Sequence, residues 1–224
     1  MKLVLRIGGS VIASPINPSL IRDYVPLLQD LKEQGHQVAV VVGGGAVARD
    51  FIKAANDLGL DEETQDEVAI SISRIIAHLV LRKLGESGCD RVPLQVEEVV
   101  SYLQEGKIPV MGGLRPGMTT DTVAALICER LDADLLVKAT DQEGIYNKDP
   151  QKHENAVKLN HLRFEELSQV FDEDIHKAGI HQIIDPEAVK ILKRDRIRVV
   201  VVYGFNPEKV MSAVEGEPVG TLIE

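Results

Sequence analysis

The sequence predicts an α/β fold with a mainly parallel central sheet that helices cover on both faces. Short runs of β-branched residues alternate with helical patterns along the whole chain, which is the pattern of repeated strand–helix units. The runs are apolar throughout, and strands of this kind are buried on both faces, as in parallel sheets. Several runs also end directly in glycine-rich turns, which mark the ends of strands.

The first part of the chain supplies two strands and three helices. The segment 2–7, KLVLRI, is predicted to be a strand, and 20–35 is predicted to be a helix that a glycine ends. The strand expected at 36–42, HQVAVVV, leads through a glycine turn into a helix at 46–59. The next helix, at 62–85, is long, and its apolar face is wider than one sheet face normally buries. We therefore expect part of that face to pack on a second subunit.

The alternation continues to the end of the sequence. The remaining strands are expected at 107–113, 133–140, 197–204 and 220–224, and the remaining helices at 96–106, 119–132, 164–171, 186–195 and 207–215. The segment 140–160 is rich in turn residues and could begin a smaller lobe. No repeat or linker divides the chain, so a single domain over 1–224 is predicted.

Composition excludes several classes of partner. The net charge is −10, and a surface of this sign repels nucleic acids and acidic membranes. There is no Trp and only 4% of the residues are aromatic, so stacking platforms for bases are not expected. Cys89 and Cys128 form no CxxC motif, which argues against a zinc site or a disulfide framework. The first apolar run is short and contains Arg6, so we expect a core strand instead of a signal peptide, and a soluble cytoplasmic protein.

Glycine-rich or polar turns follow four of the expected strands. They read IGGSV, VGGGAVAR, MGGLRPGMTTD and KATDQEGIYNKDP. Ligands of open α/β sheets bind beyond the carboxyl ends of the strands, and the free N–H groups at a helix start attract phosphate. Together the four turns predict a phosphate cradle.

Two common phosphate motifs do not explain these turns. Gly43, Gly45 and Ala48 match the dinucleotide fingerprint G-x-G-x-x-A, but the acids at 61–63 open a helix, where the fingerprint requires an acid at the end of a strand. This disfavours a dehydrogenase. The P-loop sequence GxxxxGK[ST] is absent from the chain.

The stretch GGLRPGMTTDTVAAL carries the most specific signal. Pro116 and Gly117 predict a turn, and Thr119 or Thr120 can cap the helix that follows. Asp121 then lies in the first turn of that helix, where a carboxylate is favoured by the helix dipole alone. Alternatively, Asp121 could hold Mg²⁺ or orient a phosphoryl group that is being transferred.

Arg6 is the other residue that needs an explanation. It is a cation inside an apolar strand, next to the first glycine turn, and such a charge is costly without an anionic partner. The histidines show no spacing typical of metal ligands. The predicted chemistry is therefore positioning and charge neutralisation, which is what phosphoryl transfer requires.

At these motifs the chain resembles the amino acid kinase family, and within it the archaeal type of uridylate kinase. The resemblance also covers AGIHQIIDPEAVKIL and the terminal GTLIE, and so nearly the whole chain. It implies a three-layer α/β/α sandwich in which the acceptor side spans roughly 1–132 and the ATP side roughly 133–224. It also implies transfer of the γ-phosphoryl group of ATP to UMP with Mg²⁺, and a homohexamer built as a trimer of dimers.

The same resemblance implies roles for individual residues. Arg6 and Asp121 would be catalytic, with no protein metal ligand assigned. The residues expected to contact UMP are Gly44, Asp66, Leu114, Arg115, Pro116, Gly117, Met118, Thr119 and Thr120. The residues expected to contact ATP are Gly9, Ser10, Gly45, Arg49, Thr140, Asp141, Tyr146 and Asp149.

The chain departs from the family at several positions. Asp141 replaces an Asn near ATP, Met118 replaces a frequent His, and Arg6 replaces a frequent Lys. The alternatives are another kinase of this fold, acting on acetylglutamate, aspartate, carbamate or isopentenyl phosphate, and a nucleotide- or oxyanion-binding relative without turnover.

Overall fold

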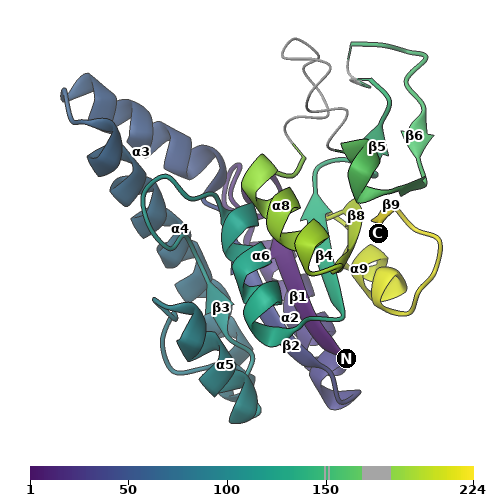
Figure 1. Cartoon of the computed structure of the whole chain (residues 1–224). Helices are drawn as coiled ribbons and strands as arrows, with labels where there is room; N and C mark the ends of the chain where they lie inside the picture. The colour runs from purple at the N-terminus through teal and green to yellow at the C-terminus, as the bar shows by residue number, and fades with distance from the viewer. Residues whose placement is uncertain (149, 151, 168–182) are drawn as a thin grey trace.

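The computed structural model describes the whole chain except residues 149, 151 and 168–182. Within the described residues, the central sheet has the strand order β3-β2-β1-β4-β8-β9-β7 (Figure 1). Its strands are β1 (Lys2–Ile7), β2 (Gln37–Val42), β3 (Val110–Met111), β4 (Leu135–Thr140), β7 (His161–Leu162), β8 (Arg198–Tyr203) and β9 (Thr221–Ile223). All neighbours are parallel except β8 and β9. The predicted, mainly parallel sheet is therefore confirmed.

The helices cover both faces of the sheet, as expected. They are α1 (Gly9–Ile12), α2 (Pro18–Glu33), α3 (Gly45–Asp57), α4 (Glu62–Leu84), α5 (Val96–Gln104), α6 (Thr120–Leu131), α8 (Pro186–Arg194) and α9 (Pro207–Val214), with a 3₁₀ turn at Gly85–Ser87. Polar side chains begin most of the longer ones: Asn17, Asp61, Thr119, Asp185 and Asn206 each accept a backbone N–H bond at a helix start.

Alternate residues of each strand build two separate cores. Leu3, Leu5 and Ile7 of β1 pack in one core with α2, α9 and the second half of α4. Val4, on the opposite face, packs in the other core with α5, α6 and α8. Because side chains alternate across a strand, Arg6 lies on the same face as Val4, the face that α6 covers. The three-layer sandwich is thus visible as two cores on either side of one sheet (Figure 1).

The structure corrects several expected boundaries. The strand expected at 107–113 is only Val110–Met111, because Pro109 has no N–H for the ladder and Ile108 makes an isolated bridge with Gly88. The turn-rich segment 140–160 contains a short antiparallel hairpin, β5 (Ile145–Tyr146) with β6 (Lys158–Leu159), which the sequence did not predict. Of the helix expected at 164–171, residues 164–167 are helical and the rest lie outside the described residues.

No helix in the described parts of the chain combines the length and the hydrophobicity needed to cross a membrane. Helices α3 and α4 pack along each other, and α3 with the first half of α4 extends away from the sheet (Figure 1). Large apolar side chains remain exposed on this pair and on the loop that joins its helices: Phe51, Leu58, Leu60, Ile75 and Leu79.

Candidate active site

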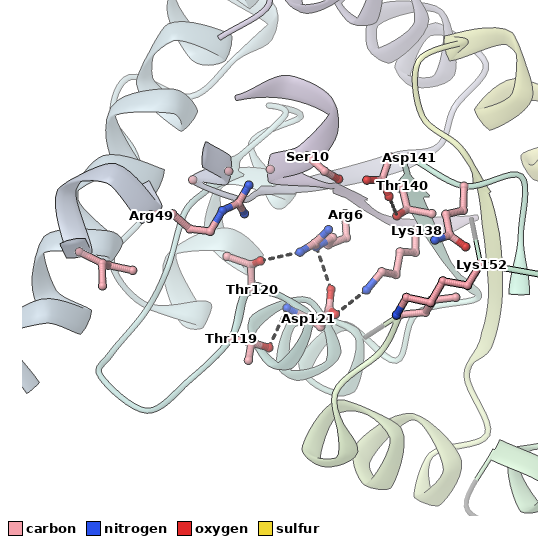
Figure 2. Close-up of a pocket in the computed structure, with 17 residues that line it drawn as sticks. Arg6, Ser10, Arg49, Thr119, Thr120, Asp121, Lys138, Thr140, Asp141 and Lys152 are labelled. Carbon is pink, nitrogen blue, oxygen red and sulfur yellow. Dashed lines mark hydrogen bonds and ion pairs between the residues drawn. The ribbon is translucent and has the colours of Figure 1, made fainter. Parts of the chain in front are cut away.

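A cavity of about 760 Å³ opens at the carboxyl ends of β1, β2 and β4. Its walls are the turns after β1 and β2, the start of α6 and the residues that follow β4 (Figure 2). Eleven residues to which the sequence analysis gave a catalytic or binding role line it: Arg6, Gly9, Ser10, Gly44, Gly45, Arg49, Thr119, Thr120, Asp121, Thr140 and Asp141. All four predicted turns therefore contribute residues to one cavity, as expected for the carboxyl ends of parallel strands.

The first two glycine turns touch each other through their backbones. A Cβ atom on Gly9 would lie 2.2 Å from the nitrogen of Gly45, and one on Gly45 would lie 2.3 Å from the carbonyl oxygen of Gly9. Gly45 also has a φ of +59°, which disfavours any residue with a side chain. These glycines are thus required for packing, independently of any ligand.

Ser14 joins the same two turns. Its hydroxyl donates to the carbonyl oxygen of Gly9 at 3.0 Å and accepts from the backbone N–H of Ala46 at 2.7 Å. The N–H groups of Gly44 and Gly45 have no acceptor among the described residues. The turns are therefore held rigidly while part of the α3 start keeps donors available for an anion.

Arg6 and Lys138 are direct neighbours across β1 and β4. Both side chains reach Asp121 at the start of α6 (Figure 2). The Nε atom of Arg6 lies 2.8 Å from Asp121 Oδ1, and the Nζ atom of Lys138 donates a short hydrogen bond to Oδ2. Arg6 also donates through Nη2 to the hydroxyl of Thr120 at 3.0 Å. One carboxylate is thus shared by two cations from adjacent strands.

This charged group is largely shielded from water. The exposed side-chain fractions are 16% for Arg6, 12% for Asp121 and 5% for Lys138. Arg6 Nε and Asp121 Oδ1 are both buried, and neither has a well-directed hydrogen bond within the described residues, so their contact is ionic. The two buried atoms thus compensate each other's charge.

Burial and charge act in opposite directions on the pKa values here. Burial alone would raise the pKa of the Asp121 carboxyl, but the charges of Arg6 and Lys138 outweigh it, and the pKa lies below its ordinary value. Burial lowers the pKa of the Lys138 ammonium to about 8, against the opposing effect of Asp121. Near neutral pH the group therefore contains two cations and one carboxylate, with a net charge of +1.

The two threonines of the TTD sequence have different tasks. Thr119 caps α6: its hydroxyl accepts from the N–H groups of Asp121 and Thr122, both at 3.1 Å. It donates its proton to Asp185 at 2.6 Å. Thr120 instead accepts from Arg6, so its own proton remains for a partner in the cavity.

The loop 114–118 does not line this cavity. Leu114, Arg115 and Met118 line a second cavity of about 550 Å³ next to α5 and α6. Gly117 donates its N–H to Asp66 of α4 at 2.7 Å. This bond joins two residues that the sequence analysis expected to contact UMP. Arg74 also holds the loop from α4, through the carbonyl oxygens of Gly113 and Leu114.

The remaining predicted residues are dispersed. Pro116 lies in the same loop, and Tyr146 lies in β5, paired with Lys158 and away from the lining of the cavity. Asp149 lies outside the described residues.

Sequence reasoning missed five further residues that line the cavity: Ile52, Lys138, Gln142, Lys152 and Ile183. For Lys138 the signal was present, because a lysine inside the apolar run LLVKAT needs an anionic partner for the same reason as Arg6. Asp185 was also missed, because a single Asp before a helix indicates only a cap.

The residues present do not fit a metal site made of protein ligands. The described residues contain no group of three or more His, Cys, Asp or Glu that could hold an ion. Both oxygens of Asp121 contact cations, which argues against the expectation that this carboxylate holds Mg²⁺ directly.

Comparison with known proteins gives a consistent result. The model of the amino acid kinase family matches residues 1–203. The chain is 39% identical to a uridylate kinase from Methanocaldococcus jannaschii and covers all of both chains. It is 40% identical to one from Methanococcus maripaludis strain S2, covering all of this chain and 99% of the relative.

Solved structures agree. The uridylate kinase from Archaeoglobus fulgidus superimposes with a TM-score of 0.89 and 37% identity over 100% of both chains. A UMP kinase from Bacillus anthracis, at 20% identity, has the same fold, with a TM-score of 0.83 over 100% of this chain and 95% of the other. Family match, full-length relatives and fold coincide, and the chain therefore belongs to the amino acid kinase family.

Proposed function

We propose that this protein is a UMP kinase that transfers the γ-phosphoryl group of ATP to the phosphate of UMP, giving UDP and ADP. The observation that carries the proposal is the group formed by Arg6, Asp121 and Lys138 at a cavity lined by glycine turns. The chain's full-length similarity to uridylate kinases supports UMP as the acceptor.

Arg6 and Lys138 would stabilise the phosphoryl group while it is being transferred. Phosphoryl transfer develops charge on oxygens that fixed cations stabilise, and a buried cation does so more strongly than an exposed one. Asp121 would hold Arg6 and Lys138 in place and prevent their mutual repulsion. Because the carboxylate of Asp121 contacts both cations, it would position Arg6 and Lys138 and would not accept a proton.

The donor would lie over the first two turns. The N–H groups of Gly9, Ser10 and Gly45, with the side chain of Arg49, would bind the phosphates of ATP. Thr140 and Asp141, which are hydrogen-bonded to each other at 3.1 Å, would lie toward its ribose, and Tyr146 and Asp149 would complete that side. This is the ATP side of the proposed domain, roughly 133–224, completed by turns from the acceptor side, roughly 1–132.

The acceptor would lie between α4 and the loop 114–120. Thr120 contacts the charged group through Arg6 and Gly44 lines the same cavity, and both would meet the phosphate of UMP. Asp66 would bind the ribose and the loop would enclose the base. In the structure one oxygen of Asp66 accepts from Gly117, so UMP must bind through the second oxygen or replace this bond.

Mg²⁺ would arrive with the nucleotide. Held by the phosphates of ATP, Mg²⁺ neutralises part of their charge. This fits an active site whose own carboxylate is paired with cations.

Because ATP and UMP are intracellular metabolites, the proposal also implies a cytoplasmic protein.

We further propose that the protein is a homo-oligomer, with a hexamer built as a trimer of dimers as the assembly that the family resemblance suggests. The exposed apolar side chains of the α3–α4 pair, among them Phe51, Ile75 and Leu79, support a subunit interface there.

The double variant Ile75→Asp/Leu79→Asp should reduce the mass measured by light scattering. Leu94→Asp, at an exposed leucine outside this pair, is the control and should leave the mass unchanged. A wild type that is monomeric and active at nanomolar concentration would contradict the proposal.

One assay tests the activity. ADP release is measured with ATP and each of UMP, CMP, AMP, GMP, acetylglutamate, carbamate and isopentenyl phosphate, with and without EDTA. UMP should be the preferred acceptor and EDTA should abolish turnover. Equal or faster turnover of acetylglutamate or isopentenyl phosphate would assign the chain to another reaction of the same family.

A further inference from the structure

Asp185 makes more contacts than a helix cap requires. Its Oδ1 atom accepts from the N–H groups of Glu187 and Ala188, both at 3.0 Å, which caps α8. The same oxygen accepts from the hydroxyl of Thr122 at 2.9 Å. The second oxygen, Oδ2, accepts from the hydroxyl of Thr119 at 2.6 Å. Asp185 therefore connects the starts of α6 and α8, which lie side by side (Figure 1).

The bond to Thr119 determines how α6 begins. A hydroxyl has one proton and two lone pairs. The proton of Thr119 goes to Asp185, so both lone pairs can accept from the N–H groups of Asp121 and Thr122. The orientation of this cap, and of the first turn that carries Asp121, is thus controlled by Asp185.

We propose that Asp185 is a positioning residue of the active site, which holds the start of α6 so that Asp121 meets Arg6 and Lys138. The inference deepens the proposed function and rests on it. Asp185 does not line the cavity, and it acts through Thr119 and Thr122. A displacement of about 1 Å at a reacting site is sufficient for a loss of about 100-fold in rate.

Charge gives a second, independent readout. The groups that face Lys138 are Arg6 from β1, Asp121 from α6 and Asp185 before α8, while Asp141 and Lys152 line the same cavity. The negative charge of Asp185 favours the protonated form of Lys138. Loss of this charge should therefore lower the pH at which Lys138 titrates.

The test is Asp185→Asn. The amide oxygen can still cap α8 and accept from Thr122, but the NH₂ group would face the hydroxyl of Thr119, whose lone pairs are already used. We expect kcat to fall by about 10- to 100-fold, with KM for ATP and UMP within about threefold. In ligand-free protein carrying ¹³C-labelled lysine, the titration midpoint of Lys138 observed by NMR should move to lower pH.

Asp61→Asn is the matched control, because Asp61 caps α4 through the N–H of Thr64 and is exposed. It should change neither kcat nor the Lys138 midpoint. Thr119→Val, which removes the link to α6 and leaves the α8 cap intact, should reproduce the loss of kcat if Asp185→Asn fails to fold.

The inference is supported if turnover falls and the midpoint moves in Asp185→Asn, and any other combination overturns it. If the wild type does not phosphorylate UMP, the proposed function fails, and the Lys138 midpoint alone then decides the inference. A midpoint that is unchanged would leave Asp185 as the cap of α8 only.

Discussion

The two ends of helix α6 each carry a carboxylate paired with an arginine, yet they differ in burial. At the start, Asp121 is 12% exposed and meets Arg6 and Lys138. At the end, Glu129 is 41% exposed and pairs with Arg194 of α8, which is 58% exposed. Water screens the second pair, and such pairs contribute little to stability. The group of Asp121, Arg6 and Lys138 carries charge where water barely reaches. Burying charge in this way costs free energy, which indicates that the group has a function other than stabilising the fold.

The same comparison explains why the first group faces a cavity. Two cations that share one carboxylate retain a net positive charge, which a bound phosphate would compensate. At the other end Arg194 already has two carboxylates, Glu129 and Asp195, and needs no further anion. Charge balance, more than residue type, distinguishes the functional end from the structural one.

The largest effect is expected for Asp121→Asn. The substitution leaves two buried cations without a counter-charge, so the free energy of unfolding should fall by about 3–5 kcal/mol. Turnover should fall by about 100-fold or more, a loss of about 3 kcal/mol of transition-state stabilisation. Binding of UMP, measured by calorimetry, should change little. Turnover within a few-fold of wild type would mean that Asp121 is only a carboxylate favoured by the helix start.

Arg6→Met and Lys138→Met should each lower kcat by about 100-fold, the range for loss of one preorganised cation. Methionine keeps the apolar stem, so both variants should fold and bind UMP. Arg6→Lys should keep partial activity, because a point charge still reaches phosphate although the planar fork is lost. A Met variant that turns over normally but melts at lower temperature would show that the cation serves only to pair with Asp121.

A smaller effect should come from pH. The pKa of Lys138 is lowered to about 8, so its cation is lost as the pH rises through this value. The Asp121 carboxyl, with a lowered pKa, stays ionised throughout. The value of kcat/KM for ATP, which reports on the free enzyme, should therefore fall about tenfold per pH unit above about pH 8. In Lys138→Arg, which keeps its charge, the residual activity should lack this decline; an identical decline would assign it to another group.

The smallest effect is expected at the exposed end of α6. Glu129→Gln should leave kcat within about twofold of wild type, and the melting temperature within about 2 °C. Thermal unfolding and the coupled assay measure both. A large loss of activity here would refute the distinction between the two ends.

The strands and turns could be predicted from the sequence because their causes are local. Apolar runs such as HQVAVVV specify buried strands whichever strand pairs with them. The bonds that Thr119 accepts from the N–H groups of Asp121 and Thr122 lie within one helical turn, although its bond to Asp185 does not. The short edge strands β5, β6 and β7 were missed because two-residue pairings leave no periodicity to detect. The glycine turns were correctly predicted at the carboxyl edge of the sheet. Part of the reason for glycine at these positions is not local, because the backbones of Gly9 and Gly45 contact each other.

By itself the sequence determined that α/β elements alternate, that glycine turns gather at the carboxyl ends of parallel strands and that Arg6 needs an anion. Only the tertiary structure decided that this anion is Asp121, more than a hundred residues away along the printed sequence. It also decided that Lys138 shares that anion and that Asp185 orients the helix carrying it. The physical reason is that a charge requires a partner but does not specify which one. The register of β1 with β4 and the packing of α6 on α8 make that choice.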